Sequence, residues 1–187
     1  MSDNSNYLAN NRKRLIDLLR NIPEASCPPG WEKLQTIAIS GFLGFGFSKE
    51  NSSLVLIVSS SGRSVIDCNT NEKIARDYDE YEGIDELGVY CLGIGPLDGE
   101  SILLGSESGG GLPLSTNNQE YLSLLSPNWP QHDLIYYSGS SHPLIENHQS
   151  SCLMIKRDFI EAVGFSWCGN YLATASSSDF EIWRKIK

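Results

Sequence analysis

The chain has 187 residues, of which 40% are hydrophobic, and a formal net charge of −9. This composition supports a folded core and excludes a disordered acidic tail, and the length fits one domain. The negative charge argues against direct binding of nucleic acid, because phosphate groups require a basic surface. We therefore expect a single domain over residues 1–187, with an N-terminal helix over 5–22 and a β domain over 31–187.

The start of the chain shows no basic segment followed by an apolar core, and no apolar run approaches the roughly eighteen residues of a membrane span. The five cysteines are odd in number and form no CxxC pair, which favours free thiols over a disulfide framework. These features predict a cytoplasmic protein that makes no membrane contact.

Residues 5–22 are expected to form an amphipathic helix. Its apolar residues recur at spacings typical of one helical face: Leu8, Leu15, Leu18, Leu19 and Ile22. Pro23 ends the helix, because the residue before a proline is disfavoured in the helical region. The basic residues of the helix are few for a membrane-surface helix, so we expect a helix docked on the domain with its charges in solvent.

Beyond Pro29 the chain becomes a series of short β segments with turns between them. Leu54–Ser59 is a continuous apolar run, which predicts a strand buried on both faces. The other predicted strands are Leu34–Ile39, Gly41–Phe47, Ser64–Cys68, Lys73–Arg76, Val89–Ile94, Ser101–Leu104, Leu134–Tyr137, Ser151–Lys156, Tyr171–Ala175 and Phe180–Trp183. Short strands at this spacing predict a mainly β fold built from antiparallel sheets.

Two segments of the chain repeat each other. Gly46-Phe47-Ser48 and Gly164-Phe165-Ser166 each precede a turn, an apolar strand (Leu54–Val58 or Tyr171–Ala175), three consecutive serines and a further strand. The distance between the copies is about three times a forty-residue period, the period of WD40 propeller blades.

The second copy resembles the last part of a WD40 blade, with Trp183 followed by Arg184 where the family pattern has aspartate. In the first copy Ile66-Asp67 takes the tryptophan-aspartate place. The resemblance implies a propeller-like arrangement, and a β-sandwich that uses two blade-like hairpins stays open as the alternative. It implies nothing about chemistry.

The charge is concentrated in one block. Asp77–Ile155 contains no lysine or arginine and twelve carboxylates, so the rest of the chain sums to +3. Such a block can present a negative field that steers and selects a positive partner. The alternative is a solvated acidic surface that only keeps the protein soluble. Carboxylates and tyrosines alternate within it, and the predicted partner-binding residues are Asp77, Tyr78, Asp79, Glu80, Tyr81, Glu82, Asp85, Glu86 and Trp129.

We expect a non-enzymatic protein, without cofactor or metal, that binds a basic protein partner. In size, charge and compartment the chain resembles bacterial immunity proteins, and this resemblance implies that the partner is a toxin domain. Two alternatives remain. One is a degenerate WD40-like scaffold in a larger assembly, and the other is a hydrolase or metalloenzyme in which His132, His142 and His148 converge with Cys152 or an acid.

Overall fold

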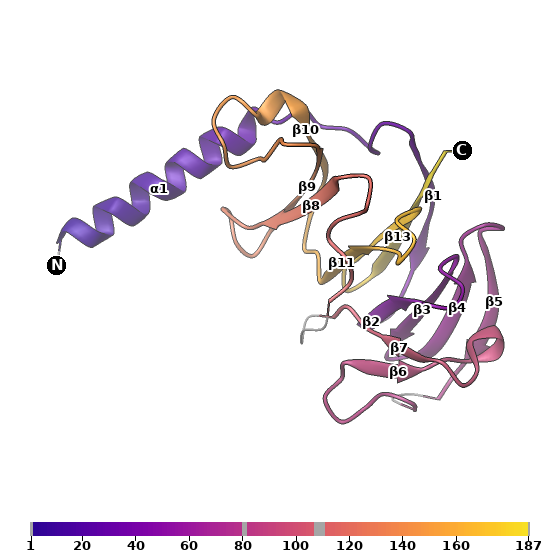
Figure 1. The fold of residues 1–187 in the computed structure, drawn as a ribbon. Helices are drawn as coiled ribbons and strands as arrows, with labels where there is room; N and C mark the ends of the chain where they lie inside the picture. The colour runs from indigo at the N-terminus through magenta and orange to yellow at the C-terminus, as the bar shows by residue number, and fades with distance from the viewer. Residues whose placement is uncertain (1, 80–81, 107–110, 187) are drawn as a thin grey trace. The chain divides into compact units, whose positions relative to one another are not determined.

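The computed structural model describes residues 2–79, 82–106 and 111–186. This part of the chain is mainly β, with several small antiparallel sheets and an N-terminal helix (Figure 1), which confirms the predicted fold class. The chain divides into two compact units. The first unit comprises Met1–Pro28 and Asn117–Phe159, and the second comprises Pro29–Thr116 and Ile160–Lys187. The organisation as a single domain stays a prediction.

The first unit combines the helix with a three-stranded sheet. Its elements are α1 (Ser2–Arg20), β8 (Glu120–Leu125), β9 (His132–Ser138), the 3-10 turn η2 (Gln149–Ser151) and β10 (Cys152–Asp158). The sheet has the order β10-β9-β8 and is antiparallel. The C-terminal end of α1 packs on it through Leu19 and Ile22, which join Ile135, Cys152 and Met154 in one buried cluster. Strand β8 was not among the predicted strands, and neither was Ala162–Phe165, strand β11 of the second unit.

The second unit contains two four-stranded antiparallel sheets and a two-stranded ribbon. The first sheet runs β2-β3-β4-β5, with β2 (Phe42–Phe47), β3 (Leu54–Ser59), β4 (Gly62–Asp67) and β5 (Glu72–Asp77). The second runs β1-β13-β12-β11, with β1 (Trp31–Ala38), β11 (Ala162–Phe165), β12 (Tyr171–Ala175) and β13 (Asp179–Lys185). The ribbon pairs β6 (Tyr90–Leu92) with β7 (Ser101–Leu103), and the 3-10 turn η1 (Gly95–Leu97) connects them.

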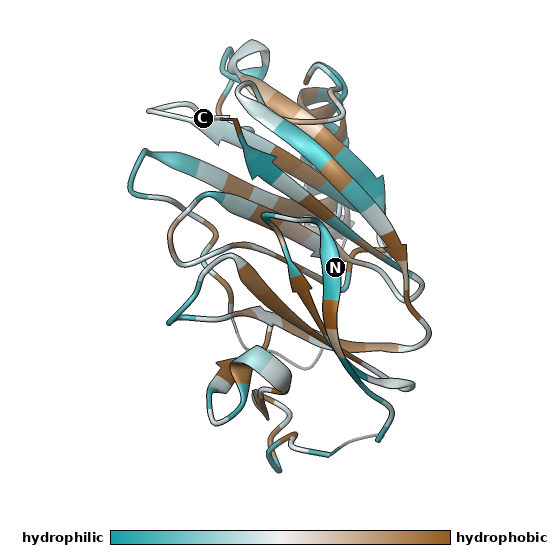
Figure 2. Cartoon of the chain, turned by 90° about the vertical axis from the view of Figure 1, so that its right-hand side faces the viewer, coloured by the Kyte–Doolittle hydropathy of each residue, from teal (hydrophilic) through white to brown (hydrophobic). Residues whose placement is uncertain are grey.

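The core of the second unit forms because its central strands bury both faces. Every residue of β3 is buried, as the continuous apolar run predicts, and so is every residue of β12. The Phe45 ring, fully buried on β2, lies 5.0 Å from the Phe180 ring on β13, so an aromatic contact joins the two sheets. Figure 2 shows hydrophobic and hydrophilic bands following one another along strands, which is typical of sheets with one buried face.

The two sheets are equivalent strand by strand. Phe47 pairs with Val55 in the first sheet, and Phe165 pairs with Leu172 in the second. On the other side of the central strand, Val55 pairs with Ile66 and Leu172 pairs with Trp183. The register therefore makes Ile66 and Trp183 equivalent positions, in agreement with the repeat read from the sequence.

The equivalence extends to a strand that the sequence repeat did not include. Glu72-Lys73 on β5 and Glu32-Lys33 on β1 face equivalent residues of β4 and β13, and a register shift follows the lysine in both pairings. Ile74 and Leu34 occupy these two shifts. The N-terminal strand β1 thus completes the second sheet as β5 completes the first.

Candidate functional site

The acidic segment is held in place by an arginine on β4. Arg63 is only 6% exposed and stands opposite Asp77, the last residue of β5. Its Nη2 donates to the Asp77 carboxylate and lies 3.6 Å from Oε2 of Glu82. Its Nη1 donates to the carbonyl oxygen of Leu92 at 3.0 Å. One buried guanidinium therefore joins the end of β5, the following loop and β6.

Two glycines let the chain approach this arginine. Gly62 has a φ of +100°, and a Cβ there would collide with the backbone of Asp77. Gly83 has a φ of +77°, and a Cβ there would collide with Nη1 of Arg63. Both positions need the left-handed conformation that glycine adopts without strain. The close packing of the acidic loop on β4 therefore depends on glycine at both positions.

The pKa values reflect this arrangement. The pKa of Asp77 is lowered from its ordinary value, first by the backbone N–H of Asp79 and then by the hydrogen bond from Arg63. Burial on its own would lower the pKa of Arg63, but the hydrogen bond to Asp77 and further interactions raise it overall. Both groups are therefore charged near neutral pH, and Arg63 compensates one of the carboxylates around it.

The other described carboxylates of the segment divide into exposed ones and one that holds a turn. Asp79, Glu82 and Glu86 are exposed, and Glu82 keeps 63% of its side chain accessible beside Arg63. Asp85 has a structural role, since its Oδ1 accepts the backbone N–H groups of Val89 at 2.7 Å and Tyr90 at 2.9 Å. The predicted site residues Glu80 and Tyr81 lie outside the described residues.

Exposed apolar side chains surround these carboxylates. Tyr78 is 78% exposed and Leu87 is 79% exposed, and Tyr90 and Leu92 on β6 also face solvent. Leu92 adjoins the acidic loop, because its N–H donates to the Gly83 carbonyl at 2.8 Å. We call the combined surface the acidic patch: Asp77, Tyr78, Asp79, Glu82, Asp85, Glu86, Leu87, Tyr90 and Leu92.

Three members of the patch, Leu87, Tyr90 and Leu92, were not among the predicted partner-binding residues. Tyr90 and Leu92 flank the buried Cys91, so alternation along β6 puts both on the exposed face. The sequence shows this alternation, but it cannot show which of the two faces is covered. Leu87 follows the last acidic residue of the segment directly and carries no pattern of its own.

The predicted site residue Trp129 belongs to the first unit, whereas the acidic patch belongs to the second. It is 76% exposed and lies in the loop between β8 and β9. In the same loop the carbonyl oxygen of Pro127 accepts a hydrogen bond from Nε of Arg12 on α1 at 2.9 Å. The environment of this loop is therefore a basic stretch of helix.

One group of side chains has a geometry that could hold a metal ion. Across residues 2–79, 82–106 and 111–186, one group of carboxylate, imidazole or thiol ligands has its atoms within 4.8 Å of one another: Asp77, Asp79 and Glu82. Oxygen ligands of this kind suit a hard cation such as Ca²⁺. Arg63 already supplies positive charge to two of the three, so a cation there would face a guanidinium.

The histidines do not form a comparable group within the described chain. His142 packs its ring on Tyr137, and its Nδ1 accepts the Leu144 N–H at 3.2 Å. His148 is connected to Cys152 through its backbone carbonyl, which lies 3.4 Å from the sulfur. A zinc or hydrolase arrangement of these side chains gains no support from their geometry.

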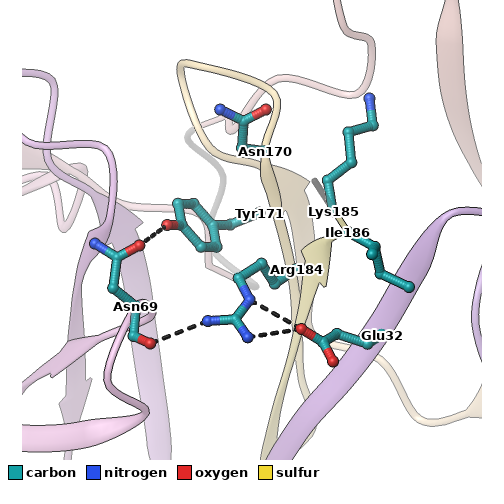
Figure 3. Close-up of a pocket in the computed structure, with 7 residues that line it drawn as sticks. All are labelled: Glu32, Asn69, Asn170, Tyr171, Arg184, Lys185 and Ile186. Atoms are coloured by element: carbon teal, nitrogen blue, oxygen red, sulfur yellow. Dashed lines mark hydrogen bonds and ion pairs between the residues drawn. The ribbon is translucent and has the colours of Figure 1, made fainter.

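A separate pocket of about 460 Å³ lies in the second unit, lined by Glu32, Asn69, Asn170, Tyr171, Arg184, Lys185 and Ile186. Figure 3 shows the Arg184 guanidinium between Glu32 and Asn69, bonded to a carboxylate on one side and a backbone carbonyl on the other. The Tyr171 hydroxyl donates to Oδ1 of Asn69 at 2.6 Å. The polar groups therefore connect β1, β12 and β13 to the turn after β4, which gives this pocket a structural role.

Comparison with models of known protein families found no match, and comparison with curated proteins found none either. Within the described residues, α1 is too polar to cross a bilayer and no other stretch forms a helix that could do so. A functional assignment must therefore come from the chemistry of the surfaces.

Proposed function

We propose that this chain is a non-enzymatic binding protein whose acidic patch takes a basic protein partner. The observation that carries the proposal is the arrangement around Arg63: a buried arginine holds exposed carboxylates next to exposed leucine and tyrosine side chains. A solvated surface needs charge alone, whereas a binding surface combines apolar anchors with a charged rim. The acidic patch has both components.

Each component has a distinct role in the proposed complex. The exposed carboxylates Asp79, Glu82 and Glu86 accelerate encounter with a positive surface and reject acidic ones. Tyr78, Leu87 and Leu92 lose exposed apolar area on binding, which supplies the non-electrostatic part of the affinity. The partner's surface is therefore expected to combine arginine or lysine with apolar side chains.

The specific form of the proposal is a basic toxin domain as partner, in the cytoplasm, neutralised in the manner of a bacterial immunity protein. Support for this form comes from charge and size, and the patch chemistry suits it. Toxin domains that act on nucleic acid carry basic active-site surfaces because their substrates are polyanions. An acidic patch that covers such a surface blocks access of the substrate.

The test uses a charge variant and a matched control. Asp79→Asn, Glu82→Gln and Glu86→Gln together remove three patch charges and leave the Arg63–Asp77 pair and the Asp85 turn in place. Glu50→Gln, Asp98→Asn and Glu146→Gln remove the same charge at exposed positions outside the patch. Tagged wild type, patch variant and control are used to capture proteins at low and high salt, and the captured protein is then titrated in purified form.

We expect wild type and control to retain the same basic protein and the patch variant to bind it on the order of tenfold more weakly, mainly through a slower on-rate. High salt should also lower the affinity of the wild-type complex, because it screens the patch charges. Equal affinity of the patch variant and the control would overturn the assignment of the patch.

A scaffold function is the second candidate, and one observation favours it. The two four-stranded sheets share strand order, register and a bulge position, as successive blades of a WD40-like repeat protein would. A scaffold of this kind would bind through exposed apolar residues with little salt dependence. Capture that persists in high salt and in the patch charge variant would therefore favour it.

A further inference from the structure

The apolar stripe of α1 continues beyond the part of the helix that is packed. Leu19 is buried on the sheet of the first unit and Leu15 is half-buried, whereas Leu8 on the same stripe is 61% exposed. Figure 1 shows the N-terminal half of α1 extending past strands β8, β9 and β10. The stripe therefore has an uncovered end within the described structure.

The uncovered end has a sequence that does not favour a helix on its own. Its first three turns contain four asparagines and two serines, which are poor helix formers. Short isolated helices are marginal in water, and most helices are stabilised by packing of their apolar face. A helical conformation over these residues therefore benefits from a surface that covers Leu8.

An exposed tryptophan, Trp129, lies in a loop close to this helix. The hydrogen bond from Arg12 to Pro127 brings the β8–β9 loop to α1, and this loop presents Trp129. Tyr7 on the helix is exposed as well. We call the surface the basic cradle, and it comprises Tyr7, Leu8, Arg12, Lys13 and Trp129.

The basic cradle is complementary to the acidic patch in charge, and both surfaces contain exposed apolar side chains. The cradle carries the cations of Arg12 and Lys13 near exposed Leu8 and Trp129, and the patch carries exposed carboxylates next to Leu87 and Leu92. Opposite charges around apolar centres favour association and fix its orientation. The two surfaces therefore match in charge and in apolar content.

We propose that the basic cradle of one copy binds the acidic patch of a second copy, so that the protein self-associates. The contact is heterologous, because different surfaces of the two copies meet, and it closes into a ring or extends as a chain of copies. The inference shares the acidic patch with the proposed function, but it needs no other protein. Self-association and partner binding then compete for the same patch.

The test is complementation between two variants in the full chain. Leu8→Ser with Trp129→Ser disables the cradle, and both positions are exposed, so folding should be retained. Asp79→Asn, Glu82→Gln and Glu86→Gln disable the patch. The mass of each protein, alone and as an equal mixture, is measured by sedimentation over a wide concentration range at low and high salt.

We expect the wild-type mass to rise with concentration and to fall back in high salt, while each variant alone stays monomeric. The mixture should form a heterodimer, because one intact cradle then meets one intact patch. A wild type that is monomeric throughout, or variants that fail to complement a self-associating wild type, would overturn the proposal. Binding of the monomeric wild type to phosphatidylserine vesicles through the cradle would also overturn it, in favour of an anionic membrane as the occupant.

The same variants separate this inference from the proposed function. The cradle variant keeps its acidic patch and should bind the basic partner at least as tightly as wild type, because self-association no longer competes. If it binds no basic partner while the wild type still self-associates, the proposed function fails and the self-association stands.

Discussion

The two four-stranded sheets of the second unit have the same register but fill one buried cross-strand position very differently. In the second sheet Phe180 faces Ile37, and Phe180 is fully buried. At the equivalent position of the first sheet Arg63 faces Asp77. A position that one sheet uses for apolar packing is thus occupied by an ion pair in the other, and the acidic patch is built at that pair.

The comparison shows that the architecture does not require the ion pair. A buried arginine needs partners for its charge, and the second sheet shows that apolar side chains close the same strands without it. In the first sheet Arg63 instead bonds Asp77, Glu82 and the Leu92 carbonyl, so the pair positions the acidic loop.

The largest effects are expected where the two sheets share a buried position. Ile66→Ala should lower the free energy of unfolding by about 2–4 kcal/mol and Trp183→Ala by about 3–5 kcal/mol, because each leaves a cavity next to a central strand. Chemical denaturation measures both. Leu87→Ala, at an exposed position, serves as the control and should stay within about 0.5 kcal/mol of wild type. A small effect at either buried position would contradict the equivalence of the sheets.

The ion pair gives the next largest effect. Arg63→Met leaves the carboxylates of Asp77 and Glu82 without their cation and should lower stability on the order of 2–3 kcal/mol. The double variant Arg63→Phe with Asp77→Ile copies the Phe180–Ile37 pair and should recover most of that loss. It should nevertheless bind the basic partner poorly, since nothing then orients the loop. A double variant that binds like wild type would show that the pair has no positioning role.

A smaller change in stability is expected at the charged cross-strand pairs between the last two strands of each sheet. Arg184 donates through two nitrogens to one oxygen of Glu32, whereas the equivalent pair, Asp67 and Glu72, brings two carboxylates together. Glu72→Lys replaces a like-charge pair by an opposite one and should stabilise the chain by about 0.2–1 kcal/mol. Glu32→Lys should destabilise it by a similar amount. Thermal unfolding at low and high salt measures both, and each shift should shrink in high salt.

The pH dependence of Asp77 is the last prediction. Its pKa is lower in the folded chain than in the unfolded chain, so the ionised carboxylate stabilises the fold at pH values above its unfolded pKa of about 3.9. This contribution disappears as the pH falls through the lowered, folded-state pKa. Urea unfolding of wild type and Asp77→Asn should therefore differ at neutral pH and converge in acid. A difference that does not change with pH would contradict the lowered pKa.

The cysteines differ in burial. Cys68, Cys91 and Cys152 are buried free thiols, and burial raises the pKa of Cys68 to about 12. Cys168 is exposed. The sequence prediction of free thiols agrees with this structure, but the order of their accessibility required the fold.

Local patterns account for what could be predicted. The apolar run over β3 has the length and continuity of a buried central strand, and the glycine and serine residues around it specify turns. The helix was expected over residues 5–22 and spans Ser2–Arg20, with Pro23 just beyond its end. Strand β8 was missed because Glu120 and Ser123 interrupt its apolar residues, and the four-residue β11 was missed as well. Pairing with β9 and with β12 defines these two strands.

The mainly β character, the central strands, the repeat and the acidic segment can be predicted from the sequence, because each is a property of neighbouring residues. The pairing of β1 with β13 and the position of Arg63 opposite Asp77 required the fold. The fold also decided that Leu87 and Leu92 are exposed and that Trp129 lies with the basic helix. These features depend on contacts between residues far apart in the chain and on which face of each strand is covered, and a single sequence specifies neither.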